Sequence, residues 1–402
     1  MRKQFILGTV VAIAAAMLPV VSAETSSAAN AAKIDYSKCT DLASCGGMDA
    51  LVKAAQKEGT LNIDTVPRDW ANYGEIIDLF TKAFGIKINS TNPDGSSADE
   101  INAIKTAPAS KKPDMYDGGI TFATGNEGLF TDYKVATFKD IPGAYKNPDG
   151  LWASNYAGEI VLMYPTDLPK IPTSIAGLSD PAFKGMVALA GNPTSAQQAL
   201  MSVFAVNQAA GGTPADITKG INWFQTMKNS GNFVTVQGNA ANFAAGAYKI
   251  LFNWSFNCPG NIETFKASGV NMQCAVPTDA QLVGTPYVAA IPKSAPHPAA
   301  ARLWEELLYS QNNKGYLTAT LPSTKGKTGS AIFKSLMGGQ NIWVSGGAAV
   351  TEAAAMQAKG VLNNPPSKYI LTAPGKTVTP TPDQQTAAKA LLTTAWPTIL
   401  GN

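Results

Sequence analysis

Short apolar strands alternate with amphipathic helices along this chain, and the alternation limits its fold more than any other feature. Strand–helix–strand units at this spacing need a crossover, which predicts parallel strands with helices on both faces of the sheet. The predicted strands are 61–65, 86–90, 115–117, 186–190, 233–236 and 250–254. The predicted helices are 48–58, 70–84, one beginning at Ser97, one ending near 210, 217–228, 240–247, 297–309 and one beginning at Asp383. We therefore predict an α/β fold whose sheets are mainly parallel.

Two extended segments, 159–164 and 287–291, lie between the two series of strands and helices. They predict that the chain crosses from one half to the other and then returns, so that two strands form a hinge. A chain of 402 residues with 45% hydrophobic residues also exceeds the usual size of one domain. We expect lobe 1 to comprise residues 33–158 and 288–340, and lobe 2 to comprise residues 159–287 and 341–402.

The first 23 residues have the pattern of a cleaved secretory signal peptide. Arg2 and Lys3 precede an uncharged apolar run over 5–21, and Val21-Ser22-Ala23 follows a small-x-small cleavage pattern. This run is short for a membrane span and lies against the cleavage site. We expect an exported, periplasmic protein.

Four cysteines form two local pairs, Cys39 with Cys45 and Cys258 with Cys274. In an oxidising compartment these pairs are the simplest disulfides, although four cysteines allow three connectivities. A zinc site is the less favoured alternative, because neither pair has C-x-x-C spacing and the single histidine, His297, is near neither pair in sequence.

Charge and motif content favour a binding protein over an enzyme. The formal net charge is +3, with two positive charges in the leader, so neither nucleic acid nor a polybasic membrane contact is expected. H-E-x-x-H, G-x-S-x-G and the phosphate-binding loop are all absent from the sequence, and His297 lies between two prolines. We predict no catalysis, no metal and no cofactor, and a monomer.

Four strand-to-helix loops rich in Gly, Ser, Thr and Asn are the candidate binding loops: 65–70, 95–97, 118–121 and 192–195. In open α/β sheets ligands bind beyond the carboxyl ends of strands, where helix N-termini present unpaired N–H groups. An ordinary cap or turn is the alternative for each loop; Ser97 and Glu100, for example, form a capping-box pattern in which Asp99 and Glu100 would be surface charges. The candidate ligand-binding residues are Thr65, Arg68, Asp69, Trp70, Ser96, Ser97, Gly119, Thr121, Thr194 and Ser195.

Aromatic residues form the second candidate binding element. Trp254 ends a predicted strand and Tyr287 lies on the return crossing, so both can stack on a flat group or a cation. Core packing is the alternative, since it is the usual role of aromatic side chains.

Several ordered segments resemble a known family. They are LVKAAQKEGTLNI, DWANYGEIIDLFTKAFGIKINSTNPDGSSADE, GLWASNYAGEIVLMY, DPAFKGMVAL with GNPTSAQQA, INWFQTMKNSGNFV, ILFNWSFN and APHPAAARLWEELLYSQNNKGY. Together they resemble the two-lobed extracellular solute-binding proteins of bacterial ABC importers, near the iron, polyamine, thiamine and phosphonate subgroup. The resemblance implies that the lobes close over a small-molecule solute and deliver it to permease subunits in the inner membrane.

The candidate residues do not identify the solute, but they rank the possible solute classes. An oxyanion solute, phosphonate or carboxylate, suits the Ser/Thr/Gly loops, with Arg68 as a bidentate partner. A polyamine or thiamine-type cation is the second choice, and Asp69, Asp99 and Asp117 are its possible partners. Ferric iron ranks third, because the resemblance implies adjacent tyrosines near Trp254-Ser255-Phe256, where this chain has none. An exported enzyme of unrecognised type comes last.

Overall fold

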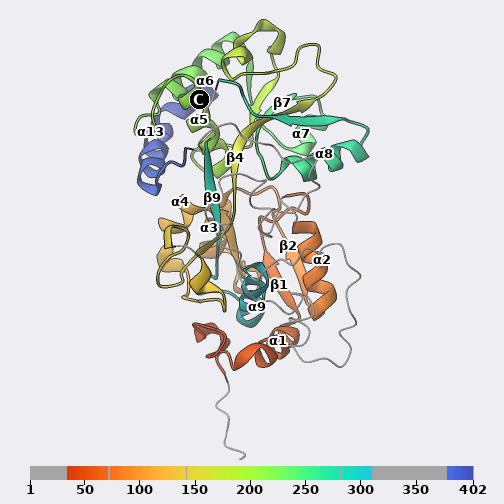
Figure 1. Cartoon of the computed structure of the whole chain (residues 1–402), viewed down its shortest axis with the longest axis vertical. Coiled ribbons are helices and arrows are strands. Elements are labelled where there is room, and N and C mark those ends of the chain that lie inside the picture. Colours follow the sequence, from red (N-terminus) through yellow and green to blue (C-terminus); the bar gives the residue numbers. More distant parts are fainter. Residues whose placement is uncertain (1–33, 71–72, 142, 280–282, 310–377, 402) are drawn as a thin grey trace, which may run out of the picture. The chain divides into compact units, whose positions relative to one another are not determined.

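Strand β4 (Ala153–Pro165) connects two groups of strands within one sheet (Figure 1). The computed structural model describes residues 34–70, 73–141, 143–279, 283–309 and 378–401, so the expected signal peptide lies outside the described residues. Residues 153–159 of β4 pair antiparallel with β9 (Gly284–Ala290), and residues 160–165 pair antiparallel with β7 (Ile250–Trp254) and β8 (Met272–Ala275). Every residue of β4 and β9 is buried, as expected for strands covered on both faces.

The first strand group contains β9 and its antiparallel neighbour β3 (Tyr116–Gly119). A separate parallel pair, β1 (Thr60–Ile63) and β2 (Lys87–Ser90), meets this group through a bridge between Ile63 and Met115. The accompanying helices are α1 (Gly47–Glu58), α2 (Tyr73–Phe84), α3 (Ser97–Thr106), α4 (Ile120–Thr124) and α9 (Pro298–Leu308).

The second strand group contains β7, β8, β5 (Val187–Leu189) and β6 (Phe233–Gln237), and β5 runs parallel to both β6 and β7. Its helices are α5 (Gln197–Ala209), α6 (Thr218–Ser230), α7 (Ala240–Ala244), α8 (Cys258–Ala267) and the C-terminal α13 (Pro382–Leu400). Short 3-10 helices cover Tyr36–Lys38, Ala109–Lys111, Glu127–Leu129, Phe138–Asp140, Gly143–Tyr145, Ala176–Ser179 and Pro181–Phe183.

The α/β class is confirmed, but the expectation of mainly parallel sheets is wrong. β4 and β9 run antiparallel to each other, and each is antiparallel to its remaining neighbours, so the seven-stranded sheet is mixed. The sequence pattern also missed α8 and β8. None of the described helices is both long enough and apolar enough to cross a bilayer.

The N-terminus of α3 departs from the expected capping box by one residue. Ser96 is the N-cap: its hydroxyl accepts a hydrogen bond from the Asp99 amide at 3.2 Å, and the Asp99 carboxylate accepts one from the Ser96 amide at 2.8 Å. Ser97 instead turns inward and accepts a hydrogen bond from the Gly119 amide at 3.1 Å.

The cysteines confirm one expected disulfide and contradict the other. Cys258 and Cys274 are bonded and join the start of α8 to β8. Cys39 and Cys45 are both free and buried, within hydrogen-bonding reach of each other. Burial raises the pKa of the Cys45 thiol, and oxidation proceeds through the thiolate, so this environment disfavours bond formation.

Candidate functional site

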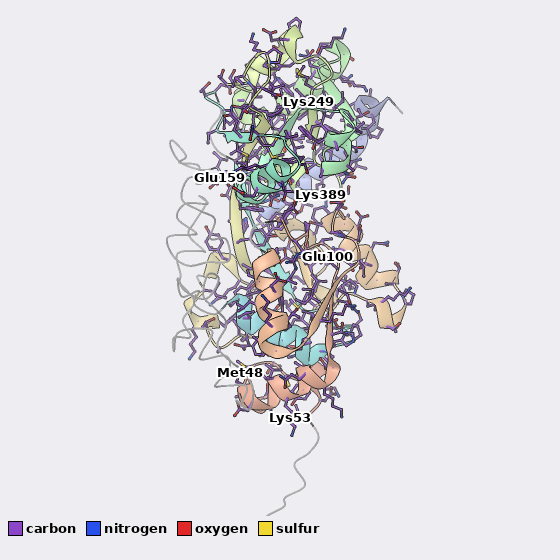
Figure 2. The ribbon with its side chains drawn as sticks, turned by 90° about the vertical axis from the view of Figure 1, so that its right-hand side faces the viewer. Met48, Lys53, Glu100, Glu159, Lys249 and Lys389 are labelled. Atoms are coloured by element: carbon purple, nitrogen blue, oxygen red, sulfur yellow. A yellow bond between two sulfur atoms is a disulfide. The ribbon has the colours of Figure 1, made fainter. Side chains whose placement is uncertain are left out.

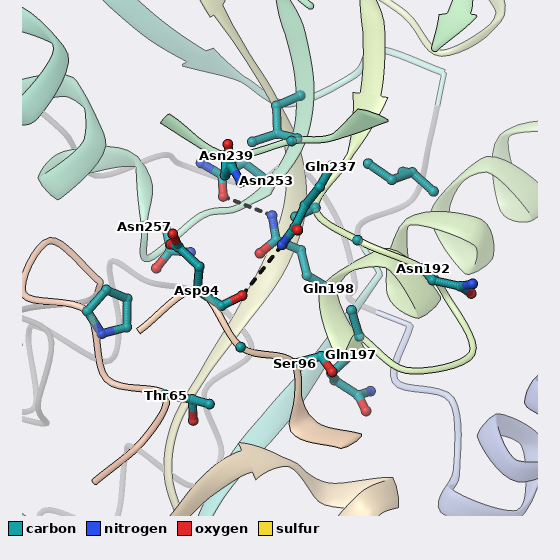
Figure 3. Close-up of a pocket in the computed structure, with 18 of the residues that line it drawn as sticks. Thr65, Asp94, Ser96, Asn192, Gln197, Gln198, Gln237, Asn239, Asn253 and Asn257 are labelled. Atoms are coloured by element: carbon teal, nitrogen blue, oxygen red, sulfur yellow. Dashed lines mark hydrogen bonds between the residues drawn. The ribbon is translucent and has the colours of Figure 1, made fainter. Parts of the chain in front are cut away.

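A cavity of about 660 Å³ is lined by loops and strand ends from both strand groups (Figure 3). Thr65 and Trp70 follow β1, Ser96 follows β2, and Asn192 and Gln198 come from the segment after β5. The volume lies within the range usual for small-molecule sites. As expected from the rule that ligands bind beyond the carboxyl ends of strands, strand-to-helix connections supply many of its polar groups.

The polar lining is acidic and rich in amides. Four carboxylic acids line the cavity: Asp69, Asp94, Asp99 and Asp117. The amide side chains are Asn92, Asn192, Gln197, Gln198, Gln237, Asn239, Asn253, Asn257 and Asn261. None of the described residues that line the cavity is a Lys, Arg or His. Among the described residues, the cavity wall therefore carries formal negative charge that no cationic side chain of the lining balances.

Asp117, on β3, is the buried member of the acidic set, with 6% of its surface exposed. It accepts hydrogen bonds from the Tyr73 hydroxyl, from the Tyr156 hydroxyl at 2.8 Å and from the Asn155 amide at 2.7 Å. Burial raises the pKa of Asp117 to about 6, and these three donors oppose the increase. The carboxyl is thus mostly ionised at pH 7 and titrates just below it.

Glu100, labelled in Figure 2, is fully buried next to Asp117. Its Oε1 accepts a hydrogen bond from the Asp117 amide at 3.0 Å. Burial, with the neighbouring Asp117 charge, raises the pKa of Glu100 well above its usual range. The expected surface position of Glu100 is wrong, because the one-residue shift of the capping box turns it inward.

An aromatic wall is fixed by the same network. The indole N–H of Trp70 donates to the Tyr156 hydroxyl at 3.0 Å, so one chain of hydrogen bonds connects Trp70, Tyr156 and Asp117. Tyr287 stacks on Tyr156, with ring centroids 5.1 Å apart, and lies 5.9 Å from Trp70. Trp70 and Tyr287 both line the cavity.

Hydrogen bonds between residues of the two strand groups surround the cavity. The Ala98 amide donates to the Ser195 carbonyl at 3.3 Å. The Gln237 amide donates to the Asp94 carbonyl at 3.5 Å, as Figure 3 shows. On the α8 side, the Asn261 amide donates to the Asp69 carboxylate at 3.5 Å.

Seven of the residues selected from the sequence line this one cavity. They are Thr65, Asp69, Trp70, Ser96, Ser97, Ser195 and Tyr287. The rule that places ligands beyond the strand ends therefore brings three of the four candidate loops together.

The remaining loop residues do not line the cavity. Arg68 is exposed and pairs with Asp78 at 2.8 Å, so the guanidinium expected to contact an oxyanion does not line the cavity. Gly119 lies buried against Gln197, and Thr121 donates a hydrogen bond to Gln385. Thr194 closes its own turn through Asn192 at 2.9 Å.

Trp254, which was expected to contact the ligand, also lies outside the cavity lining. It is fully buried outside the cavity lining, stacks on Phe256 with centroids 5.5 Å apart, and donates its indole N–H to the Tyr287 hydroxyl at 3.3 Å. Both faces of β7 are covered, so the last residue of that strand packs in the core. Trp254 therefore supports Tyr287, which lines the cavity, and does not line the cavity itself.

The sequence reading missed most of the amide side chains. Gln198 donates to Asn253 at 3.1 Å and to the Phe252 carbonyl at 3.0 Å, which fixes two cavity amides against each other (Figure 3). Asn253 and Asn257, which flank Trp254-Ser255-Phe256, could have indicated these amides, because polar residues at the carboxyl end of a strand often line a binding site. Within the described residues, His, Cys, Asp and Glu side chains form no group of three or more that could hold a metal ion.

Comparison with known proteins agrees with this geometry. Residues 113–328 match the family described as bacterial extracellular solute-binding protein. No curated protein matches the chain in sequence. A solved periplasmic thiamin binding protein has 15% sequence identity and a TM-score of 0.56, with 85% of this chain and 96% of that one covered.

Two further solved structures share the fold. AgtB from A. tumefaciens R10, in complex with agropinic acid, has 16% identity and a TM-score of 0.56, with 86% of this chain and 99% of that one covered. The periplasmic binding protein AfuA from Actinobacillus pleuropneumoniae, with fructose-6-phosphate bound, has 15% identity and a TM-score of 0.52, with 84% and 97% covered. At these identities the likeness is one of fold, whereas the family match extends over more than half of the sequence. The chain therefore belongs to the bacterial extracellular solute-binding protein family.

Proposed function

We propose that this protein is the periplasmic receptor of an ABC importer and that its solute is an organic amine cation of the polyamine or thiamine type. The observation that carries the proposal is the acidic cavity: four aspartates line it, with no cationic side chain among the described lining residues. An ammonium group that leaves water needs a carboxylate partner, and a buried carboxylate needs a cation.

The same geometry disfavours the oxyanion that the sequence ranked first. Arg68 pairs with Asp78 at the surface, away from the cavity lining. The N-terminus of α3 is occupied by its own Asp99 carboxylate, so an anion there would meet like charge. An anionic solute would also have to approach Asp117 and Asp69 without a compensating partner among the described lining residues.

The aromatic wall supports a flat or delocalised cation. Trp70 and Tyr287 line the cavity together with Asp117, and a cation over aromatic rings gains electrostatic attraction from them. A thiamin-binding protein is among the structures that share this fold.

Delivery of the solute requires that the cavity open and close. We assign the described parts of residues 33–158 and 288–340 to one lobe and the described parts of 159–287 and 341–402 to the other, with β4 and β9 as the hinge strands between them. Residues 310–377 of these expected spans lie outside the described residues. A solute that contacts both walls favours the closed arrangement by its differential affinity. The closed monomer then docks on permease subunits in the inner membrane and releases the solute.

A thermal-shift panel tests the solute class. A ligand that binds only the folded state raises the melting temperature according to the ratio of its concentration to its dissociation constant. We expect spermidine, putrescine or thiamine to raise it, and methylphosphonate, phosphate esters and citrate to leave it unchanged. A shift with the anions alone would contradict the proposal.

A further inference from the structure

Gln385, in the first turns of α13, is a fully buried amide with four hydrogen bonds. Its Oε1 accepts from the Thr121 hydroxyl and from the Gln197 amide at 2.7 Å. Its Nε2 donates to the Pro380 carbonyl at 2.8 Å and to the Thr285 hydroxyl at 3.4 Å. Both halves of this amide are therefore satisfied.

The two donors to Gln385 come from different strand groups. Thr121 lies in α4, directly after β3, whereas Gln197 is the first residue of α5 and lines the cavity. Gln197 also presses against Gly119, where an added Cβ would lie 2.3 Å from its Oε1. This close approach brings the end of β3 against the α5 wall of the cavity.

Helix α13 packs on both strand groups through other residues as well. Trp396 contacts Phe224 of α6 and Phe233 of β6, with ring centroids 5.3 and 6.1 Å away. Lys389, labelled in Figure 2, lies over the Phe122 ring of α4, 3.5 Å from its centroid. The C-terminal helix thus contacts both strand groups. We call the cavity-lining residues that accompany the first and the second strand group the two cavity walls.

We propose that Gln385 is a positioning residue that latches the two cavity walls together by holding Thr121 and Gln197 on one oxygen atom. The inference rests on the proposed function only in taking this cavity as the solute site. Without the Gln385 amide, the buried Thr121 hydroxyl and Gln197 amide lose their shared acceptor, and buried unpaired donors are costly. Separation of the walls lets water satisfy both groups, so the open arrangement gains population.

Amide hydrogen exchange at Ala98, measured by NMR without solute, tests directly whether Gln385 keeps the two cavity walls together. The Ala98 amide donates to the Ser195 carbonyl at 3.3 Å, so its exchange reports separation of the walls. We expect Gln385→Ala to speed this exchange at least about fivefold, from the cost of an unpaired buried group. Thr121→Val should act similarly, and the double variant should add little, because both changes break one contact.

Thr393→Ala is the matched control, since Thr393 is exposed on the same helix. It should leave Ala98 exchange unchanged. If Gln385→Ala lowers the melting temperature but leaves Ala98 exchange at the wild-type rate, Gln385 only stabilises α13 and the latch is wrong. If Gln385→Ala does not fold, Thr121→Val decides by the same readout.

Solute kinetics give an independent second readout. Spermidine should leave the Gln385→Ala protein at least about fivefold faster, with its association rate nearly unchanged, because the latch acts on the closed form. Absence of binding of both spermidine and thiamine in the wild type would contradict the proposed solute class alone, because the exchange measurement contains no solute.

Discussion

The Tyr156 hydroxyl donates a 2.8 Å hydrogen bond to Asp117 and accepts a 3.0 Å hydrogen bond from the Trp70 indole. One buried carboxylate thereby sets the orientation of a phenol and, through it, of an aromatic ring in the cavity wall. Tyr287 stacks on the same phenol ring, 5.1 Å away between centroids. The charge and the aromatic surface of the site are therefore parts of one preorganised network, which lowers the cost of ordering side chains on binding.

Cation binding should weaken as the pH falls through about 6, where Asp117 gains a proton. Protonation removes the negative charge that attracts an ammonium group, so the affinity for spermidine should fall about tenfold for each pH unit below that value, if one proton competes with the cation. Isothermal titration between pH 5 and pH 8 measures the slope. Affinity that stays constant or rises toward pH 5 would show that Asp117 does not pair with the cation.

Substitution of Trp70 should weaken thiamine binding, whereas substitution of Trp254 should lower the melting temperature. Trp70→Ala removes aromatic surface from the cavity wall, and thiamine should bind about tenfold more weakly, from a typical cation–π contribution. Trp254→Phe removes a core indole and should lower the melting temperature while thiamine affinity stays within about twofold. Fluorescence titration and thermal melts of both variants check this. The reverse assignment of the two effects would restore Trp254 as a ligand contact.

Unfolding stability should be higher at pH 5.5 than at pH 8. Burial raises the pKa of Glu305 to about 8, of Glu306 to about 7 and of Asp117 to about 6. The folded state therefore binds more protons than the unfolded state between the ordinary carboxyl pKa and these values, and stability falls as the pH rises across that window.

His297 acts in the same direction, because its hydrogen bond to Asp114 raises its pKa and the associated stability is lost as the pH rises through that value. We expect a melting temperature about 5 °C higher at pH 5.5, from typical unfolding entropies. Differential scanning calorimetry without solute measures it. The Glu305→Gln variant is the matched comparison and should show a smaller pH dependence; a wild-type protein more stable at pH 8 would contradict the burial of these acids.

Thiol titration in denaturant should find two free thiols before reduction and four after it. Cys39 and Cys45 are the free pair, and Cys258–Cys274 is the bonded pair. Replacing both Cys258 and Cys274 by Ser should lower the free energy of unfolding by roughly 3 kcal/mol, from loss of the loop constraint. No titratable thiol in the unreduced protein would mean that Cys39 and Cys45 are bonded after all.

Hydrophobic periodicity and the positions of strand ends predicted many of the helices, both crossing segments and three of the four cavity loops. The apolar spacing located helices such as α1 and α9 to within a residue or two, and the two crossing segments fall within β4 and β9, allowing for one residue beyond β9. The candidate loops after β1, β2 and β5 all reach the cavity, because connections at one edge of a sheet must meet.

What failed depended on single-residue register and on partners distant in sequence. The stretch Ser96-Ser97-Ala98-Asp99-Glu100 contains two overlapping capping boxes, and only tertiary packing decides which serine caps the helix. Arg68 was expected to contact an oxyanion in the cavity, but its side chain is exposed and pairs with Asp78, ten residues away on α2. Hydrogen bonds such as Thr121 to Gln385 join positions 264 apart, beyond any local pattern.

The most direct test of a cation-selective cavity is isothermal titration of spermidine, thiamine and methylphosphonate into the wild type, Asp117→Asn and Asp167→Asn at pH 7.5. Asp167 is an exposed aspartate outside the cavity lining and serves as the matched control. At least one of the two cations should bind the wild type and the control equally and bind Asp117→Asn about 10- to 100-fold more weakly, from loss of a charged hydrogen-bond partner. Methylphosphonate should not bind. Tighter binding of methylphosphonate than of either cation, or a cation affinity that Asp117→Asn leaves unchanged, would contradict the proposed cation site.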